Sequence, residues 1–148
     1  MSAYTDETYV NTYFATRLNT DAWDESSTAD RTAALTMATE AIDRLNLRGD
    51  LADDDQELQF PRDADTDIPA DIKKACAEIA LALLDGVDPD LEFENLGMTS
   101  QGYSNVRSTY DRSRAVEHVV AGIPSITAWR YIKPYLRDGH SVRVHRVS

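Results

Sequence analysis

The sequence lacks the residue patterns that identify most enzymes, metalloproteins and cofactor-binding proteins. It has a single cysteine, Cys76, so no internal disulfide can form. The three histidines lie late in the chain without the spacing of metal ligands, and one cysteine cannot build a thiolate zinc site. Glycine-rich phosphate loops and the GxSxG and HExxH motifs are also missing. We therefore expect a protein that is not an enzyme and that uses no metal and no cofactor.

Long apolar runs are missing as well. No stretch approaches the roughly 18–20 apolar residues that a helix needs to cross a bilayer. The first residues, MSAYTDETY, lack the basic and apolar regions of a signal peptide. We expect synthesis and residence in a cytosol, with no membrane partner.

Positive charge is scarce and unevenly distributed. The net charge of the 148 residues is −11. Residues 1–90 contain 7 Lys and Arg against 21 Asp and Glu, whereas residues 91–148 contain 8 against 5. An acidic surface repels phosphate, so binding of nucleic acid over most of the molecule is disfavoured. The basic C-terminal part predicts a different surface with a different partner.

A helix over residues 69–85 is the strongest element of the sequence. Pro69 suits the first helical position, and Gly86 suits the position just after a helix. Towards its C-terminal end the helix is apolar on nearly every face, so it must be surrounded by protein. We expect a mainly α protein, a small helical bundle around this helix. The residues that recur at helical spacing are Ile72, Ala75, Cys76, Ile79, Ala80, Leu83 and Leu84.

Weaker helical patterns surround the central helix. We expect a helix over about 6–18, with Leu18 in its apolar stripe, and one over about 28–45. A single turn near 21–25 presents Trp23, which we interpret as a core residue rather than a stacking platform for a ligand. A last helix begins after Ser125 and should kink or end near Pro134.

The residues between about 47 and 67 form a long irregular connection. Phe60 precedes a proline and is expected to be extended, with its ring in the core. Arg62 then points elsewhere, either to a carboxylate of a neighbouring subunit or simply along a loop that one aromatic anchors. Asp63, Asp65 and Asp67 have the spacing that begins a calcium loop, but the required Gly and the final Glu are absent, so calcium is not expected.

Two segments differ in character from the helices. Residues 96–112 are polar and alternate like a strand, which predicts a β-hairpin or extended arm that pairs with another chain, or else a mobile loop. Residues 137–148 alternate valine unevenly with arginine and predict an extended tail that a partner orders, although such tails are often disordered. The expected organisation is one helical domain over 1–136, with the arm inserted, followed by a docking tail over 137–148.

Several short motifs resemble those of small head–tail connector proteins of tailed bacteriophages, also called adaptor or head-completion proteins. Relatives of this type are often labelled as DnaT-like single-strand DNA-binding proteins. The order and spacing of the motifs carry the resemblance, since each motif alone consists of packing residues. Residues 53–55 and 96–112 match least well. The motifs are YFATRL at 13–18, DAW at 21–23, AID at 41–43, QFPR at 59–62, PADIKKA at 69–75 and AWRYIKPYL at 128–136.

The resemblance implies a structural virion protein at the head–tail junction, assembled in the host cytoplasm. Such subunits form a ring, commonly of twelve, beneath the portal protein, and the ring extends the DNA channel and receives a tail or stopper protein. Genomic DNA then passes an acidic wall without sequence-specific binding, because each missing Lys or Arg removes a phosphate contact. A neighbouring subunit would cover part of the central helix near Leu81 and Leu84.

Candidate contact residues follow from this resemblance. The tail would dock on the portal, through ionic contacts of its arginines and apolar contacts of its valines. The arm would contact neighbouring subunits or the next tail ring. The tail residues are Arg137, His140, Val142, Arg143, Val144 and Arg146, and the subunit or tail contacts are Arg62, Tyr103, Val106, Arg107, Tyr110 and Arg112.

The alternative is a replication accessory protein that binds single-stranded DNA. Such binding requires basic residues interleaved with aromatic ones. Only residues 103–114 and the helix over 129–137 approach this pattern in the sequence. Tight, salt-sensitive binding of single-stranded DNA by the isolated protein would favour this alternative over the connector.

Overall fold

The structure, a computed structural model, describes residues 3–91, 93–94 and 117–137. The expected mainly helical fold is confirmed. Within the described ranges, β-type pairing is limited to two isolated bridges, Leu47 with Leu136 and Leu51 with Arg62. The helices are α1 (Glu7–Phe14), α2 (Asp21–Asp24), α3 (Thr28–Asp43), α4 (Ala70–Leu84), α8 (Glu117–Val120), α9 (Ile126–Ile132) and the 3₁₀ helix η1 (Lys133–Tyr135).

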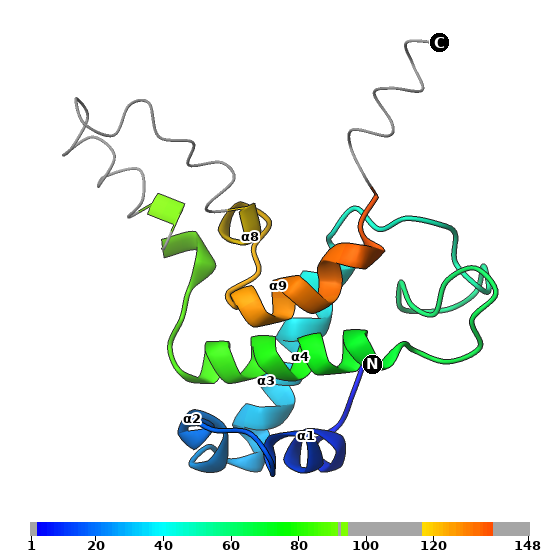
Figure 1. The fold of residues 1–148 in the computed structure, drawn as a ribbon. Helices are drawn as coiled ribbons and strands as arrows, with labels where there is room; N and C mark the ends of the chain where they lie inside the picture. Colours follow the sequence, from blue (N-terminus) through cyan, green and yellow to red (C-terminus); the bar gives the residue numbers. More distant parts are fainter. Residues whose placement is uncertain (1–2, 92, 95–116, 138–148) are drawn as a thin grey trace, which may run out of the picture.

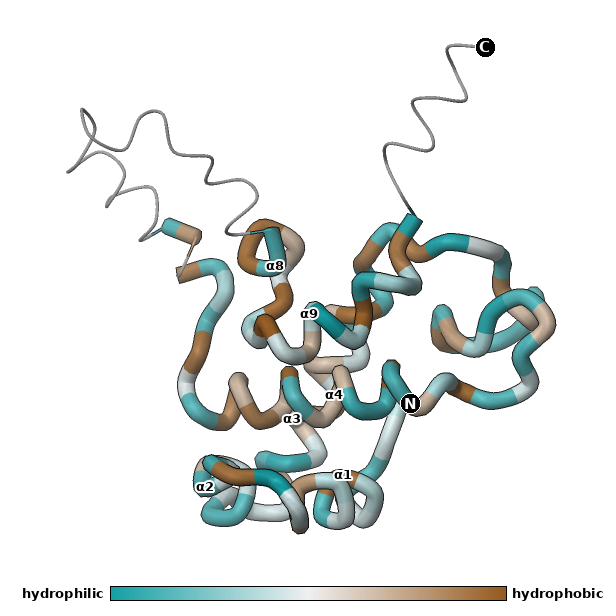
Figure 2. Tube along the Cα trace, viewed as in Figure 1, coloured by the Kyte–Doolittle hydropathy of each residue, from teal (hydrophilic) through white to brown (hydrophobic). Residues whose placement is uncertain are grey.

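Helix α4 is the centre of the bundle, as the sequence predicts. It packs against α3 and α9 and also contacts α1 and α2 (Figure 1). Its first turns are hydrophilic and its later turns are largely hydrophobic (Figure 2). Gly86 has a φ of +89°, the left-handed conformation in which glycine terminates a helix without strain. Leu81 is buried by its own chain, so its expected cover from another subunit is not needed, whereas Leu84 is half-buried.

Helix α1 is shorter than its sequence pattern predicts. It ends at Phe14, and Leu18, which we placed in the apolar stripe, is 81% exposed. The chain turns away after Arg17 and Asn19 has a φ of 63°, which a helix cannot contain. The N-cap is Asp6, whose side chain accepts the backbone N–H of Tyr9 at 2.9 Å.

The other helix signals are mostly confirmed. Ser27 and Ser125 cap α3 and α9 by accepting the N–H groups of Asp30 and Ala128. Pro134 lies in η1, where the last helix changes to 3₁₀ geometry. Ile126, the first residue of α9, is 44% exposed. Residues 89–91 are also helical.

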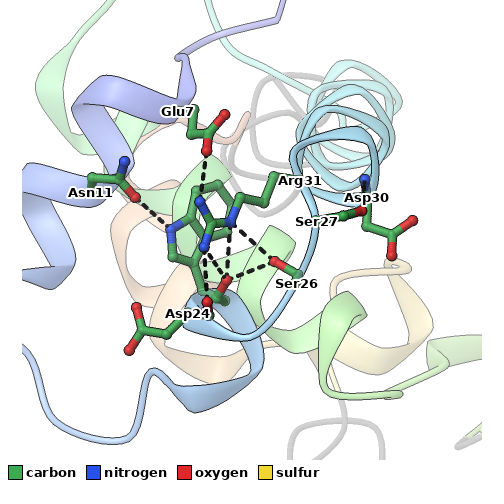
Figure 3. Close-up of polar contacts among 8 residues, drawn as sticks. Glu7, Asn11, Asp24, Ser26, Ser27, Asp30 and Arg31 are labelled. Carbon is green, nitrogen blue, oxygen red and sulfur yellow. Dashed lines mark hydrogen bonds and ion pairs between the residues drawn. The ribbon is translucent and has the colours of Figure 1, made fainter.

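Trp23 and Arg31 join α1, α2 and α3. Figure 3 shows Arg31 directed towards Glu7 of α1. The Trp23 side chain is fully buried, and its Nε1 donates to Asn11 Oδ1 at 2.8 Å. The Arg31 guanidinium lies 4.9 Å from the Trp23 ring centre and donates to the Trp23 carbonyl from Nε and Nη2. Its Nη1 donates to Glu7 Oε2 at 2.6 Å. The interpretation of Trp23 as a core residue is therefore confirmed.

The long connection between α3 and α4 is held by two anchors. Phe60 is buried, as expected, with its ring centre 5.8 Å from that of Tyr4. Arg62 donates to the carbonyls of Arg48 (2.8 Å), Gly49 (2.5 Å) and Gln59 (3.1 Å). Its guanidinium thus fixes the loop to its own chain. The residues of the predicted arm lie outside the described ones, as does the predicted tail after Arg137.

Cys76 should behave as an inert core residue. Burial raises the pKa of its thiol to about 11, from an ordinary value of 9.0. We expect a thiol reagent at pH 8 to label Cys76 only after addition of denaturant. Between pH 9 and 11 the unfolded chain releases a proton that the folded chain retains, so this group lowers stability as pH rises through that window.

The Cys76→Ala variant should lack that alkaline component when unfolding is followed by circular dichroism from pH 8 to 11. Rapid labelling of the native protein at pH 8 would contradict the burial of this thiol.

Candidate nucleic-acid interface

Three tyrosines and two lysines from three helices meet beside the N-terminal half of α4. Tyr9 and Tyr13 lie one turn apart on α1 and therefore share a face. Lys73 of α4 places its Nζ 5.5 Å from the Tyr9 ring centre, and Lys74 places its Nζ 5.9 Å from that of Tyr131 on α9. Both distances are within the range of cation–π attraction, about 6 Å. We call these five residues the tyrosine–lysine cluster.

The buried carboxylate of Glu78 lies beside the cluster and binds one of its tyrosines. Glu78 on α4 accepts a hydrogen bond from Tyr13 Oη at 2.6 Å, and the hydroxyls of Tyr13 and Tyr131 lie 3.4 Å apart. Arg17 Nη1 forms an ion pair with the same Glu78 oxygen. The Glu78 side chain is 2% exposed and that of Arg17 is 33% exposed. Arg17, the more exposed of the two partners, therefore neutralises the buried carboxylate of Glu78.

Burial and the contacts with Glu78 determine the protonation states of Tyr13 and Arg17. Burial raises the pKa of Tyr13 above its ordinary value, and the hydrogen bond to Glu78 raises it further. Burial alone would lower the pKa of Arg17, but the hydrogen bond to Glu78 and its charge raise it above the usual value. At neutral pH Tyr13 is thus a neutral donor and Arg17 is charged.

The two lysines supply the charge that a ligand would meet. In the described part of the chain, no carboxylate lies within ion-pair distance of Lys73 or Lys74. Their ammonium groups can bind phosphate, and half-buried tyrosine rings beside them can stack on bases. Asp71, on the first turn of α4, limits the positive potential; its Oδ2 accepts from Tyr135 Oη at 3.4 Å. The chemistry available is that of a small site for a strand of nucleic acid.

Two other features, a cluster of metal ligands and a membrane-spanning helix, are absent from the described residues. Among those that the structure describes, no three His, Cys, Asp or Glu side chains come together as metal ligands would. In that same part of the chain, no helix has the length and apolarity to cross a membrane.

Two of the contact residues predicted from sequence lie in the described part. The guanidinium of Arg62 bonds to its own loop, as given above, and contact with another subunit stays a prediction. Arg137 is exposed, and its backbone N–H donates to the Asn46 carbonyl at 2.9 Å. Neither belongs to the tyrosine–lysine cluster. The other predicted contact residues lie outside the described ones: Tyr103, Val106, Arg107, Tyr110, Arg112, His140, Val142, Arg143, Val144 and Arg146.

Sequence reasoning missed most of the cluster. Basic and aromatic residues alternate in the helix predicted over 129–137, and this helix contributes Tyr131. The signals from the other members were a pair of tyrosines four residues apart and a pair of adjacent lysines. Each pair has an ordinary role on a helix surface. Only the packing of α1 and α9 against α4 brings them together.

Comparison with known proteins gives one family. Residues 1–147 match the model of the family described as "Putative DnaT-like ssDNA binding protein". No curated protein and no solved structure matches the chain. The family match includes every helix described above and all five residues of the tyrosine–lysine cluster. The chain therefore belongs to this DnaT-like ssDNA-binding family.

Proposed function

We propose that the protein binds single-stranded DNA at the tyrosine–lysine cluster. The observation that carries this proposal is the convergence of Lys73 and Lys74 with three tyrosine rings across α1, α4 and α9. The lysines contact phosphates, and Tyr9 and Tyr131 stack on bases. The description of the family supports the same activity.

The charge of the chain sets the expected strength of this binding. Two lysines allow about two phosphate contacts, for which the logarithm of the affinity should fall with the logarithm of salt concentration with a slope near −1.4. The net charge of −11 repels the rest of the strand. We therefore expect modest affinity that disappears as salt is raised, and little preference among sequences.

A Lys73→Gln/Lys74→Gln variant should lose most of the affinity for single-stranded DNA, roughly tenfold at low salt, because both phosphate contacts are removed. The measurement is a fluorescence-anisotropy titration of a labelled oligothymidine at several salt concentrations. Tyr131→Leu should weaken binding separately, since stacking contributes about 1–3 kcal/mol per base.

An Arg44→Gln/Arg48→Gln variant is the matched control. Both arginines are exposed and lie outside the cluster, and the variant loses the same charge. Equal losses of affinity in the two double variants would overturn the proposed site, because they would show that only net charge matters. Circular dichroism of each variant verifies that the helices are retained.

A second candidate function is the head–tail connector subunit, a ring-forming virion protein under the portal. Two observations favour it. The net charge of −11 suits a channel wall past which DNA slides. Several large apolar side chains are exposed, as expected of a subunit whose neighbours are missing: Leu18, Met37, Leu91, Phe93, Val120 and Ile126.

Electron microscopy of the protein mixed with its portal tests this candidate directly. Rings seated on the portal would support it. A chain without residues 137–148 should keep its helical circular dichroism but fail to join portal-containing heads, since the tail would supply the contacts with the portal. Normal joining by the shortened chain would contradict the docking role of the tail.

A further inference from the structure

An apolar groove runs between α3 and the C-terminal end of α4, separate from the tyrosine–lysine cluster. Its volume is about 510 Å³. Small side chains, Ala33, Ala34 and Ala41, line the α3 side, and Leu83 and Leu84 line the α4 side. Met37 also lines it and is 53% exposed. The groove therefore offers apolar surface that the described residues do not cover.

The rim of the groove is acidic. Asp30 lies at one end, and Asp88 and Asp90 follow α4, with Arg44 as the basic residue of the rim. One oxygen of Asp88 accepts the N–H of Asp90 at 3.0 Å, which leaves its second oxygen for another partner. The floor of the groove is its apolar lining. A segment that binds to both the floor and the acidic rim must carry apolar side chains together with positive charge.

The path of the chain brings its C-terminal part close to this rim. The N–H of Arg137 donates to the carbonyl of Asn46 at 2.9 Å, and Leu136 pairs with Leu47. Asn46 is two residues beyond Arg44, which lines the groove. The eleven residues after Arg137 can span up to about 36 Å when extended, so they are long enough to run from Asn46 along the groove.

The composition of this C-terminal part matches the groove. Residues 142–147 read VRVHRV, and residues 140–148 contain two arginines and no acidic residue. Residues 1–90, by contrast, are strongly acidic. In an extended chain, neighbouring side chains point to opposite sides, so Val142 and Val144 can face the floor while Arg143 faces the rim.

We propose that residues 142–147 occupy the groove of their own chain. Val142 and Val144 pack on Met37, Leu83 and Leu84, and Arg143 pairs with the carboxylates of the rim. A partner that binds the tail would then uncover the groove. This inference rests on the groove and the course of the chain, and it does not depend on DNA binding.

Cysteine cross-linking in the full-length protein tests the proposal. Met37→Cys is combined in turn with Val142→Cys, Val144→Cys or Val147→Cys, and the disulfide formed under mild oxidation is followed on non-reducing gels. At least one pair should give a cross-linked monomer, about tenfold faster than a control pair, because a tethered segment that binds has an effective concentration in the millimolar range. The control is Leu18→Cys with the same tail cysteine, since Leu18 is exposed and lines neither this groove nor the cluster.

The possible results are distinct. Covalent dimers in place of cross-linked monomers would overturn the proposal by showing that a second copy supplies the segment. Equal rates for Met37→Cys and Leu18→Cys, or no cross-link at any of the three positions, would overturn it as well. Arg143→Glu/Arg146→Glu in the fastest pair should slow the cross-link several-fold, and an unchanged rate would contradict the ionic pairing. Cys76 is buried in every variant and does not compete.

Discussion

Replacing Arg17 with methionine should lower the free energy of unfolding by about 3 kcal/mol, because it leaves the buried Glu78 carboxylate without its cation. Loss of one member of a buried pair typically costs about 3–5 kcal/mol, and we expect the lower end because Arg17 is 33% exposed and water can reach part of the site. Tyr13 still donates to the carboxylate at 2.6 Å, which limits the loss further. Urea denaturation at pH 7 measures the change.

Three variants separate the possible causes of this loss. Arg17→Lys keeps the charge and should recover much of the stability. Glu78→Gln removes the charge that needs a partner and should cost less than Arg17→Met. The double variant Arg17→Met/Glu78→Met replaces the pair with apolar groups, a change that is often neutral. A loss below about 1 kcal/mol in Arg17→Met, the value of an exposed pair, would contradict the buried role of Glu78.

The Arg17–Glu78 pair is also in contact with the tyrosine–lysine cluster through Tyr13. Tyr13 and Tyr131 meet over Glu78, and Lys74 lies on the ring of Tyr131. In the absence of Arg17, movement of the Glu78 carboxylate towards solvent would shift α4 relative to α1. We therefore expect Arg17→Met to weaken single-strand binding beyond what the loss of one charge explains, whereas Arg17→Lys should leave binding close to that of the natural chain.

Local patterns in the sequence located most of the helices. The apolar spacing of α4, the start of the last helix after Ser125 and the stop at Gly86 act within a few residues, and each is seen in the structure. The end of α1 was misplaced because Leu18 fits the apolar spacing. The left-handed backbone at Asn19 ends that pattern, and spacing alone does not encode it.

The candidate site was much harder to predict because its contacts are distant in sequence. Tyr13 is 65 residues from Glu78 and 118 from Tyr131. Arg62 shows the same limit: the sequence left open a contact with another subunit or a place along its own loop, and only the fold shows that its donors meet carbonyls of that loop. Charge and aromatic residues can be counted in a sequence, but which of them meet depends on how the helices pack.

Trp23→Ala should have the largest effect on stability of any single change in the described core, about 3–5 kcal/mol. The side chain is fully buried, and its ring packs edge to face on Phe14 with the centres 5.9 Å apart. Removing it leaves a cavity among α1, α2 and α3 and takes away the surface on which Arg31 lies. Because Trp23 is itself a fluorophore, unfolding should be followed by circular dichroism.

Smaller changes at the same place divide this loss into its parts. Trp23→Phe keeps much of the ring but loses the donor to Asn11, so it should cost less than Trp23→Ala. Asn11→Ala removes only that acceptor and should cost about 1–3 kcal/mol, the penalty of an unsatisfied buried donor. A loss in Trp23→Ala no greater than that in Asn11→Ala would contradict the packing role of the ring. Since α1 carries Tyr9 and Tyr13, Trp23→Ala should also weaken single-strand binding, whereas Leu18→Ala, at an exposed site, should change neither property.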